Sequence, residues 1–338
     1  MLKSIYVPLA VLYYDLDLMF TIKGLSEKSS KENNIHIHAS IVGMPEHLNG
    51  FDESINEMQN AYPHVKITYQ IHAPLIKNMG VGPGRSLAML GYKDEDYMLQ
   101  IDPHTFLDYN WDNIFISMLD ESISLTKNNK TILTCYLDRY TYDENGLPNS
   151  NFNAHYCFFD VAPKEKQAKS NYYGEVIPIW QLCGAEDMRN ISQKKYYPSI
   201  KFNANLSFGN KEFINHTGLF KEAIFYEEEI LQTIDLFNNG FCLVYPSSKV
   251  PAAHLYQNES ESPVPRRKSI SDLINWDLCQ EQTAHNFVNY LNSNKDSVER
   301  YQNYINFDFH KQTRIDLSGP HHIPSVPEYF LNEGQDAR

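Results

Sequence analysis

Apolar residues recur in alternating strand-like and helix-like patterns through the first third of the chain. The expected strands are residues 4–12, 35–41, 65–71 and 97–101, and the expected helices between them are residues 16–31, 51–62 and 83–91. Such alternation is typical of an α/β fold, in which helices cover both faces of a mostly parallel sheet. Ligands of these sheets bind beyond the carboxyl ends of the strands, so the residues after Ile101 are the first place to look for chemistry.

The pattern is less regular in the second half of the chain. A helix is expected at residues 111–126 and a strand at 131–137, then strands at 154–161, 175–182 and 201–208. A helix at 227–238 leads into a strand at 241–245, and residues 257–268 form a polar loop or lid before helices at 270–292 and 297–304. The tail from Ser318 is expected to be irregular.

Composition and charge narrow the classes of protein. The 338 residues are 42% hydrophobic and 21% charged, enough for a core that needs no metal to hold it together. A net charge of −13 gives no electrostatic footprint for a nucleic-acid backbone. Five cysteines without a CxxC pair favour a reducing compartment, and no apolar run reaches the ~18 residues of a membrane span. We therefore expect a cytoplasmic protein with no membrane partner.

An acid and a histidine follow the fourth expected strand, at Asp102 and His104. In extended geometry residues i and i+2 point the same way, so the two side chains can hold one ion between them. A mixed oxygen and nitrogen donor set suits Mn²⁺ or Mg²⁺ better than a structural Zn²⁺. The alternative is a turn that Asp102 caps, with His104 on the surface.

Three further features have both a structural and a functional interpretation. Glu227 and Glu228 begin an expected helix, where carboxylates either complement the helix dipole or serve catalysis. The glycine-rich segment 80–85 precedes another helix and forms either a tight turn or a phosphate cradle to which Arg85 contributes. His254, just past a strand, is either a ligand or a structural residue.

Together these segments resemble the GT-A glycosyltransferases, and within them the cytoplasmic hydroxyproline N-acetylglucosaminyltransferases. The most specific segment is Glu95-Asp-Tyr-Met-Leu-Gln-Ile-Asp-Pro-His-Thr105, which is similar to the family motif E-D-Y-x-L-Q-I-D-S-H-T. Weaker similarities follow the family order at residues 5–17, 84–85, 110–112, 227–230 and 240–246. The resemblance covers roughly residues 4–256.

The resemblance implies a GT-A (Rossmann-like) fold, a mostly parallel sheet flanked by helices. The expected GT-A domain is residues 1–256, with a nucleotide-sugar-binding half (1–112) and an acceptor-side half (113–256). Residues 257–338 would add a loop and a helical C-terminal extension. The implied reaction uses a nucleotide-sugar donor, UDP-linked, with Mn²⁺ (or Mg²⁺) on its diphosphate, and transfers the sugar to a hydroxyl acceptor with retention of configuration.

Site residues carry over from the resemblance by position. Asp102, His104 and His254 look like the metal ligands; Asp15, Arg85 and Asp102 fall where similar enzymes hold the donor; and Glu227 and Glu228 align with a catalytic G-E-E segment. Two positions depart from the family pattern. Tyr226 replaces the glycine of G-E-E, and Tyr14-Asp15 stands where an Arg-Asp pair is usual.

The sequence leaves the identity of the acceptor undecided. The family default is a protein hydroxyl, whereas a composition rich in Asn, Lys, Ile and Tyr, typical of AT-rich bacterial or viral genomes, suits a hydroxymethylated DNA base or a surface glycan equally well. Arg266 and Arg267 form a basic cluster that either orders over the donor, contacts the acceptor, or is a solvated loop. A non-catalytic sugar-binding protein and a metal-dependent hydrolase are the rival functions.

Overall fold

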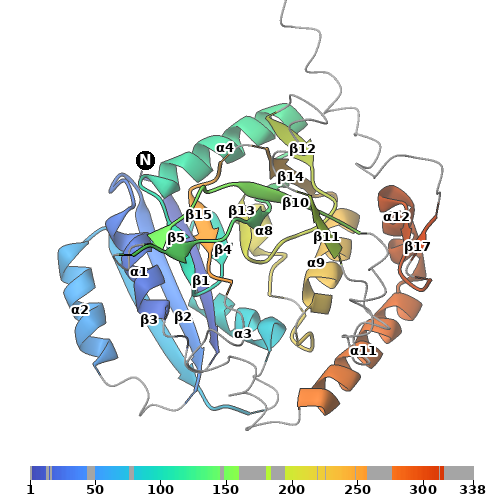
Figure 1. Ribbon diagram of the computed structural model, residues 1–338, viewed down its shortest axis with the longest axis horizontal. Helices are drawn as coiled ribbons and strands as arrows, with labels where there is room; N and C mark the ends of the chain where they lie inside the picture. Colours follow the sequence, from blue (N-terminus) through green and yellow to red (C-terminus); the bar gives the residue numbers. More distant parts are fainter. Residues whose placement is uncertain are drawn as a thin grey trace, which may run out of the picture.

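Eight strands form one central sheet with helices on both faces, as the computed structural model in Figure 1 shows. The structure describes residues 2–12, 15, 17–43, 50–75, 80–144, 148–159, 180–183, 195–218, 220–224, 226–247, 249–256, 276–311 and 313–315. The strand order is β12 (Tyr196–Pro198), β14 (Cys242–Pro246), β6 (Thr131–Thr134), β13 (Leu206–Asn210), β4 (Tyr97–Ile101), β1 (Ser4–Leu12), β2 (Asn34–Val42) and β3 (Val65–His72). Only β12 and β13 run antiparallel to their neighbours. The expected mostly parallel sheet is therefore confirmed.

Alternation along β1 sends its side chains into two different cores. Ile5 and Val7 lie in the larger core, together with residues of α1 (Leu18–Glu27), α2 (Phe51–Ala61) and α4 (Trp111–Thr126). Tyr6 instead joins a second cluster with Phe213 of the short helix α8 (Lys211–Ile214). Successive strand residues face opposite sides of a sheet, so burial on both faces requires helices on both faces.

Two more helices lie near the carboxyl end of β4. Helix α3 (Val81–Ala88) continues into a 3₁₀ turn at Met89–Gly91, and α9 (Tyr226–Asn238) leads into β14. The C-terminal helices α11 (Trp276–Ser293) and α12 (Lys295–Ile305) pack beside α9, with the Phe237 and Tyr301 rings 5.4 Å apart (Figure 1).

Small sheets surround the main one. The pair most relevant to function is β5 (Thr105–Leu107) with β15 (Ala252–His254), which is antiparallel. The others are β10 (Ala154–Phe159) between β7 (Tyr136–Leu137) and β11 (Trp180–Cys183), β8 (Thr141–Tyr142) with β9 (Pro148–Asn149), and β16 (Phe307–Asp308) with β17 (Thr313–Arg314). Among the described residues no helix is both long and apolar enough to cross a membrane.

One expected strand is wrong over most of its length. Residues 201–208 alternate as a strand should, but β13 begins only at Leu206. The reason is that side chains satisfy the backbone before it. The Phe202 N–H donates to Thr233 Oγ1 at 2.9 Å, and the Ala204 N–H donates to the Glu229 carboxylate at 2.7 Å. Those bonds hold the segment against α9 instead of a neighbouring strand.

The pattern also missed the short elements β5, β12, β15 and α8. The expected loop at residues 257–268 with Arg266 and Arg267, the start of the helix expected at 270–292 and the tail from Ser318 lie outside the described residues.

Candidate metal centre and active site

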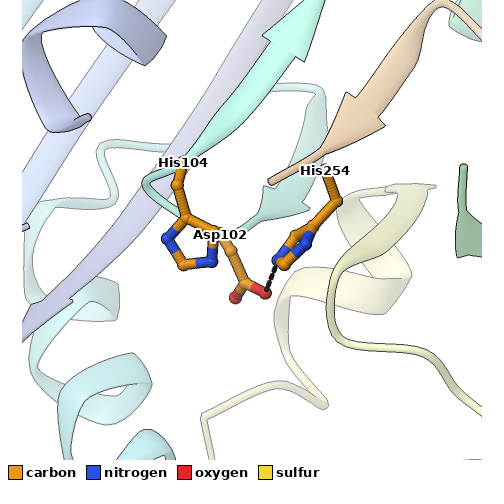
Figure 2. Close-up of side chains that lie close together, drawn as sticks. All are labelled: Asp102, His104 and His254. Atoms are coloured by element: carbon orange, nitrogen blue, oxygen red, sulfur yellow. Dashed lines mark hydrogen bonds and ion pairs between the residues drawn. The ribbon is translucent and has the colours of Figure 1, made fainter. Parts of the chain in front are cut away.

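Asp102, His104 and His254 converge at the carboxyl end of β4. Each offers one ligand atom, and these atoms lie within 4.8 Å of one another. Figure 2 shows the Asp102 carboxylate between the two imidazoles, with a hydrogen bond to His254. His254 Nε2 is 3.0 Å from Asp102 Oδ2, and the two imidazole rings meet edge to face with centroids 4.5 Å apart. Among the described residues this is the one group of three or more such side chains that could hold a metal ion.

The β5–β15 pair brings the third residue to the first two. Asp102 directly follows β4 and His104 directly precedes β5. His254 pairs with Thr105 in the register of β5 and β15, so it lies beside the Asp-x-His turn although it is far away in sequence. The Leu255 N–H donates to the His104 carbonyl at 3.1 Å and closes the junction. His254 thus ends a strand rather than following one.

Helix α1 holds the Asp-x-His turn from the other side. The Thr21 hydroxyl donates to the Pro103 carbonyl at 2.9 Å and accepts from the Thr105 N–H at 2.9 Å. The Thr105 hydroxyl donates to the Asp102 carbonyl at 2.7 Å. The turn is therefore fixed by side-chain hydrogen bonds as well as by its two strands.

Arg85 and two imidazoles surround the Asp102 carboxylate. Burial opposes ionisation, but the hydrogen bond from His254 and the charges of His254, His104 and Arg85 outweigh it and lower the pKa of Asp102 below its usual range. The side chain is still 26% exposed. An ionised carboxylate that is partly open to solvent can accept a further cation.

Arg85 links this centre to α9. Its Nη1 donates to Glu228 Oε2 at 2.5 Å and its Nη2 donates to Asp102 Oδ1 at 3.4 Å. Burial, together with repulsion from Glu229 and Glu227 and against the attraction of Arg85, raises the pKa of Glu228 to about 7. The guanidinium is thereby shared between a candidate metal ligand and a candidate catalytic residue.

The other two carboxylates in the first turn of α9 have local partners. Glu227 accepts a hydrogen bond from the backbone N–H of Ile224, just before the helix. Glu229 accepts from the buried Lys201 ammonium at 2.5 Å. Favourable placement of acids at a helix N-terminus thus explains part of the sequence pattern. A catalytic role for Glu227 or Glu228 stays a prediction.

The glycine-rich segment allows two backbone segments of the chain to approach each other closely. The N–H groups of Val81 and Gly82 donate to the carbonyls of Ile224 and Ala223 at 2.9 and 3.0 Å. A Cβ on Gly82 would lie 2.1 Å from the Phe220 carbonyl oxygen. The first N–H groups of α3 are therefore engaged by backbone carbonyls, and the interpretation that they cradle a phosphate is not supported by this arrangement.

Sequence reasoning missed how the site is held. Asp15 was expected at the donor, but its carboxylate Oδ2 lies 2.9 Å from His104 Nδ1. Tyr256 was not singled out, yet its ring lies against His254 with centroids 4.2 Å apart. Its hydroxyl donates to the Leu137 carbonyl at 3.0 Å and accepts from Asn205. A Tyr two residues after the histidine is the only local signal.

The donor set fits a divalent cation. One carboxylate and two imidazoles are three protein ligands, and the partial exposure of Asp102 leaves further coordination positions for a substrate. Such a mixed set is suited to Mn²⁺ and similar borderline cations. Residues Asp102, His104 and His254 would hold the ion.

Comparison with known proteins agrees with the fold. The crystal structure of GalNAc-T7 with UDP, GalNAc and Mn²⁺ is similar with a TM-score of 0.50 and 16% sequence identity, over 83% of this chain and 50% of that one. The chain thus spans about half the length of GalNAc-T7. A crystal structure of residues 1–349 of S. aureus TarS matches with a TM-score of 0.39 and 11% identity, over 75% of this chain and 60% of that one. No curated protein sequence matches the chain.

The fold is that of the GT-A glycosyltransferases. Residues 4–322 match the family model described as Glycosyltransferase (GlcNAc), and the chain belongs to that family.

Proposed function

We propose that the protein is a metal-dependent glycosyltransferase that moves a sugar from a UDP-linked donor to a hydroxyl acceptor with retention of configuration. The observation that supports it most directly is the convergence of Asp102, His104 and His254 on one point at the carboxyl end of the sheet. A net charge of −13 gives no overall electrostatic attraction for a diphosphate, so a local cation is the simplest way to bind one.

Each residue of the site has its own role in the proposed reaction. Asp102, His104 and His254 hold the cation, which when bound supplies Lewis-acid stabilisation of the nucleoside diphosphate leaving group. Arg85, fixed between Asp102 and Glu228, presents a permanent positive charge beside the same place. Glu227 and Glu228 lie at the N-terminus of α9, where Glu228 pairs with Arg85, and we assign both to the transfer step.

The acceptor we propose is a hydroxyl on a protein, which follows from the resemblance to hydroxyproline glycosyltransferases. A hydroxymethylated DNA base and a surface glycan are the other acceptors to be offered. Mass spectrometry of hydroxyproline, serine and threonine peptides, of DNA containing hydroxymethylated bases and of oligosaccharides, each incubated with enzyme and donor, separates the three.

The decisive test is release of UDP from UDP-GlcNAc, UDP-GalNAc, UDP-glucose and UDP-galactose, with and without Mn²⁺. We expect turnover of one donor that needs Mn²⁺, and loss of about 100-fold or more in Asp102→Asn. The matched control is Asp235→Asn, which alters a carboxylate 3.4 Å from His216 that belongs to no ligand cluster. No Mn²⁺-dependent turnover with any donor would favour a sugar-binding protein. Free sugar formed without any acceptor would favour a hydrolase.

A further inference from the structure

We infer that Asp15 is a positioning residue for the metal centre, whose carboxylate orients the His104 imidazole. This rests on the proposed function, because it concerns the same cation site. The observation behind it is the contact of His104 Nδ1 with Asp15 Oδ2 at 2.9 Å.

Asp15 is itself held in place. Its other carboxylate oxygen, Oδ1, accepts from the Asp17 N–H at 3.3 Å, and its carbonyl accepts from the Leu18 N–H at 3.2 Å at the start of α1. The carboxylate of Asp15 is only 4% exposed and the His104 ring 11% exposed. A buried carboxylate that is held in place by contacts at the start of a helix can fix the orientation of the imidazole ring it contacts.

The chemistry of histidine ligands makes this contact meaningful. A neutral imidazole carries one N–H, and a hydrogen bond from one ring nitrogen to a carboxylate leaves the other nitrogen as the metal ligand. With Nδ1–H donating to Asp15, the lone pair of His104 is on Nε2. A carboxylate that fixes a histidine ligand in this way strengthens its bond to a cation.

The β1–β4 pairing explains why this residue can reach His104. These strands are parallel neighbours, so the segments after them emerge at the same edge of the sheet. Asp15 follows β1 and His104 follows β4. Thr21, in the first turn of α1, forms hydrogen bonds with the backbone of Pro103 and Thr105 on either side of His104. The start of α1 and the residues before it therefore contact the Asp-x-His turn twice. Thr21 bonds its backbone, and Asp15 contacts the imidazole of the proposed ligand His104.

The experiment measures Mn²⁺ binding to the full chain by calorimetry, without donor or acceptor. We expect Asp15→Ala to raise the Mn²⁺ dissociation constant about 10- to 100-fold, with Asp15→Asn in between because the amide oxygen can still accept the bond. The control is Asp108→Asn, whose carboxylate accepts from the Tyr109 N–H within its own turn.

A second readout does not depend on metal. ¹⁵N chemical shifts of the imidazoles identify which ring nitrogen carries the proton; we expect the Nδ1–H form of His104 in the wild type and in Asp108→Asn, and a mixture in Asp15→Ala. Unchanged Mn²⁺ affinity and an unchanged tautomer in Asp15→Ala would overturn the inference. If wild type binds Mn²⁺ and Asp102→Asn does not, unchanged binding and an unchanged tautomer in Asp15→Ala refute the role of Asp15 alone; if wild type itself fails to bind Mn²⁺, the proposed function fails first.

Discussion

Replacing Glu228 by glutamine removes one ionisable group from the buried cluster around Arg85 while nearly preserving its shape. Glu228 is 2% exposed, and its pKa is raised from 4.5 to about 7 by burial and by Glu229 and Glu227, against the attraction of Arg85. Folding therefore favours the protonated form of this side chain. Its contribution to stability is greatest at low pH and is lost as the pH rises through the native pKa.

The magnitude follows from the two pKa values. Between pH 5 and pH 8, a carboxyl that titrates at about 7 in the native state and at 4.5 in the unfolded chain lowers the free energy of unfolding by about 2–3 kcal/mol. Glutamine does not titrate. The difference in unfolding free energy, Glu228→Gln minus wild type, should thus rise by about 2–3 kcal/mol over that range.

Urea denaturation of both proteins at half-unit pH steps measures this difference, and every other titrating group cancels in it to first order. Glu222→Gln, a substitution at an exposed position, calibrates the method. A difference that stays flat from pH 5 to pH 8 would show that Glu228 is ionised throughout, held by Arg85 more strongly than burial opposes it. That result would refute the raised pKa of Glu228 in the native state.

Two stability predictions concern other close contacts. Gly82→Ala should destabilise the fold by roughly 1–3 kcal/mol, because its Cβ meets the Phe220 carbonyl, whereas Gly24→Ala in α1, with no atom within 4 Å of a Cβ, should stabilise by about 0.5–1 kcal/mol. Thermal melts compare them, and equal shifts would refute the clash. Asp112→Asn should cost about 2–3 kcal/mol in urea denaturation, since the buried carboxylate accepts three hydrogen bonds from Ser30 and Asn33. A loss no larger than that of the exposed Asp120→Asn would contradict this.

Local pattern was sufficient for the elements whose burial is simple. The bounds of β1, β4 and α4 agree with those expected, because their apolar residues are buried by neighbours on the predicted faces. The pattern of apolar positions wrongly predicted a strand at residues 201–205. Apolar residues alternate there, but the polar residues between them are buried too. Lys201 is 0% exposed and pairs with Glu229 of α9, a contact that no local rule contains.

Some features of the candidate site could likewise be predicted from the sequence, and others could not. The spacing of Asp102 and His104 left two interpretations open, a shared ion and a capped turn with His104 on the surface. The two residues do lie in a turn between β4 and β5, and their ligand atoms nevertheless converge there. His254 required the resemblance, because its approach depends on the pairing of two three-residue strands distant in sequence. The contacts of Asp15 with His104 and of Arg85 with Glu228 depend on how helices enter and leave the sheet, which the pattern of apolar positions does not specify.

The docking of β15 on β5 has a consequence for the order of events during synthesis. Asp102 and His254 are separated by 152 positions, so a nascent chain leaves the ribosome with β1 to β4 complete long before the third ligand exists. The proposed ligand set is therefore complete only late in synthesis. A polypeptide that ends between Pro246 and Ala252 would contain every strand of the central sheet but lack His254.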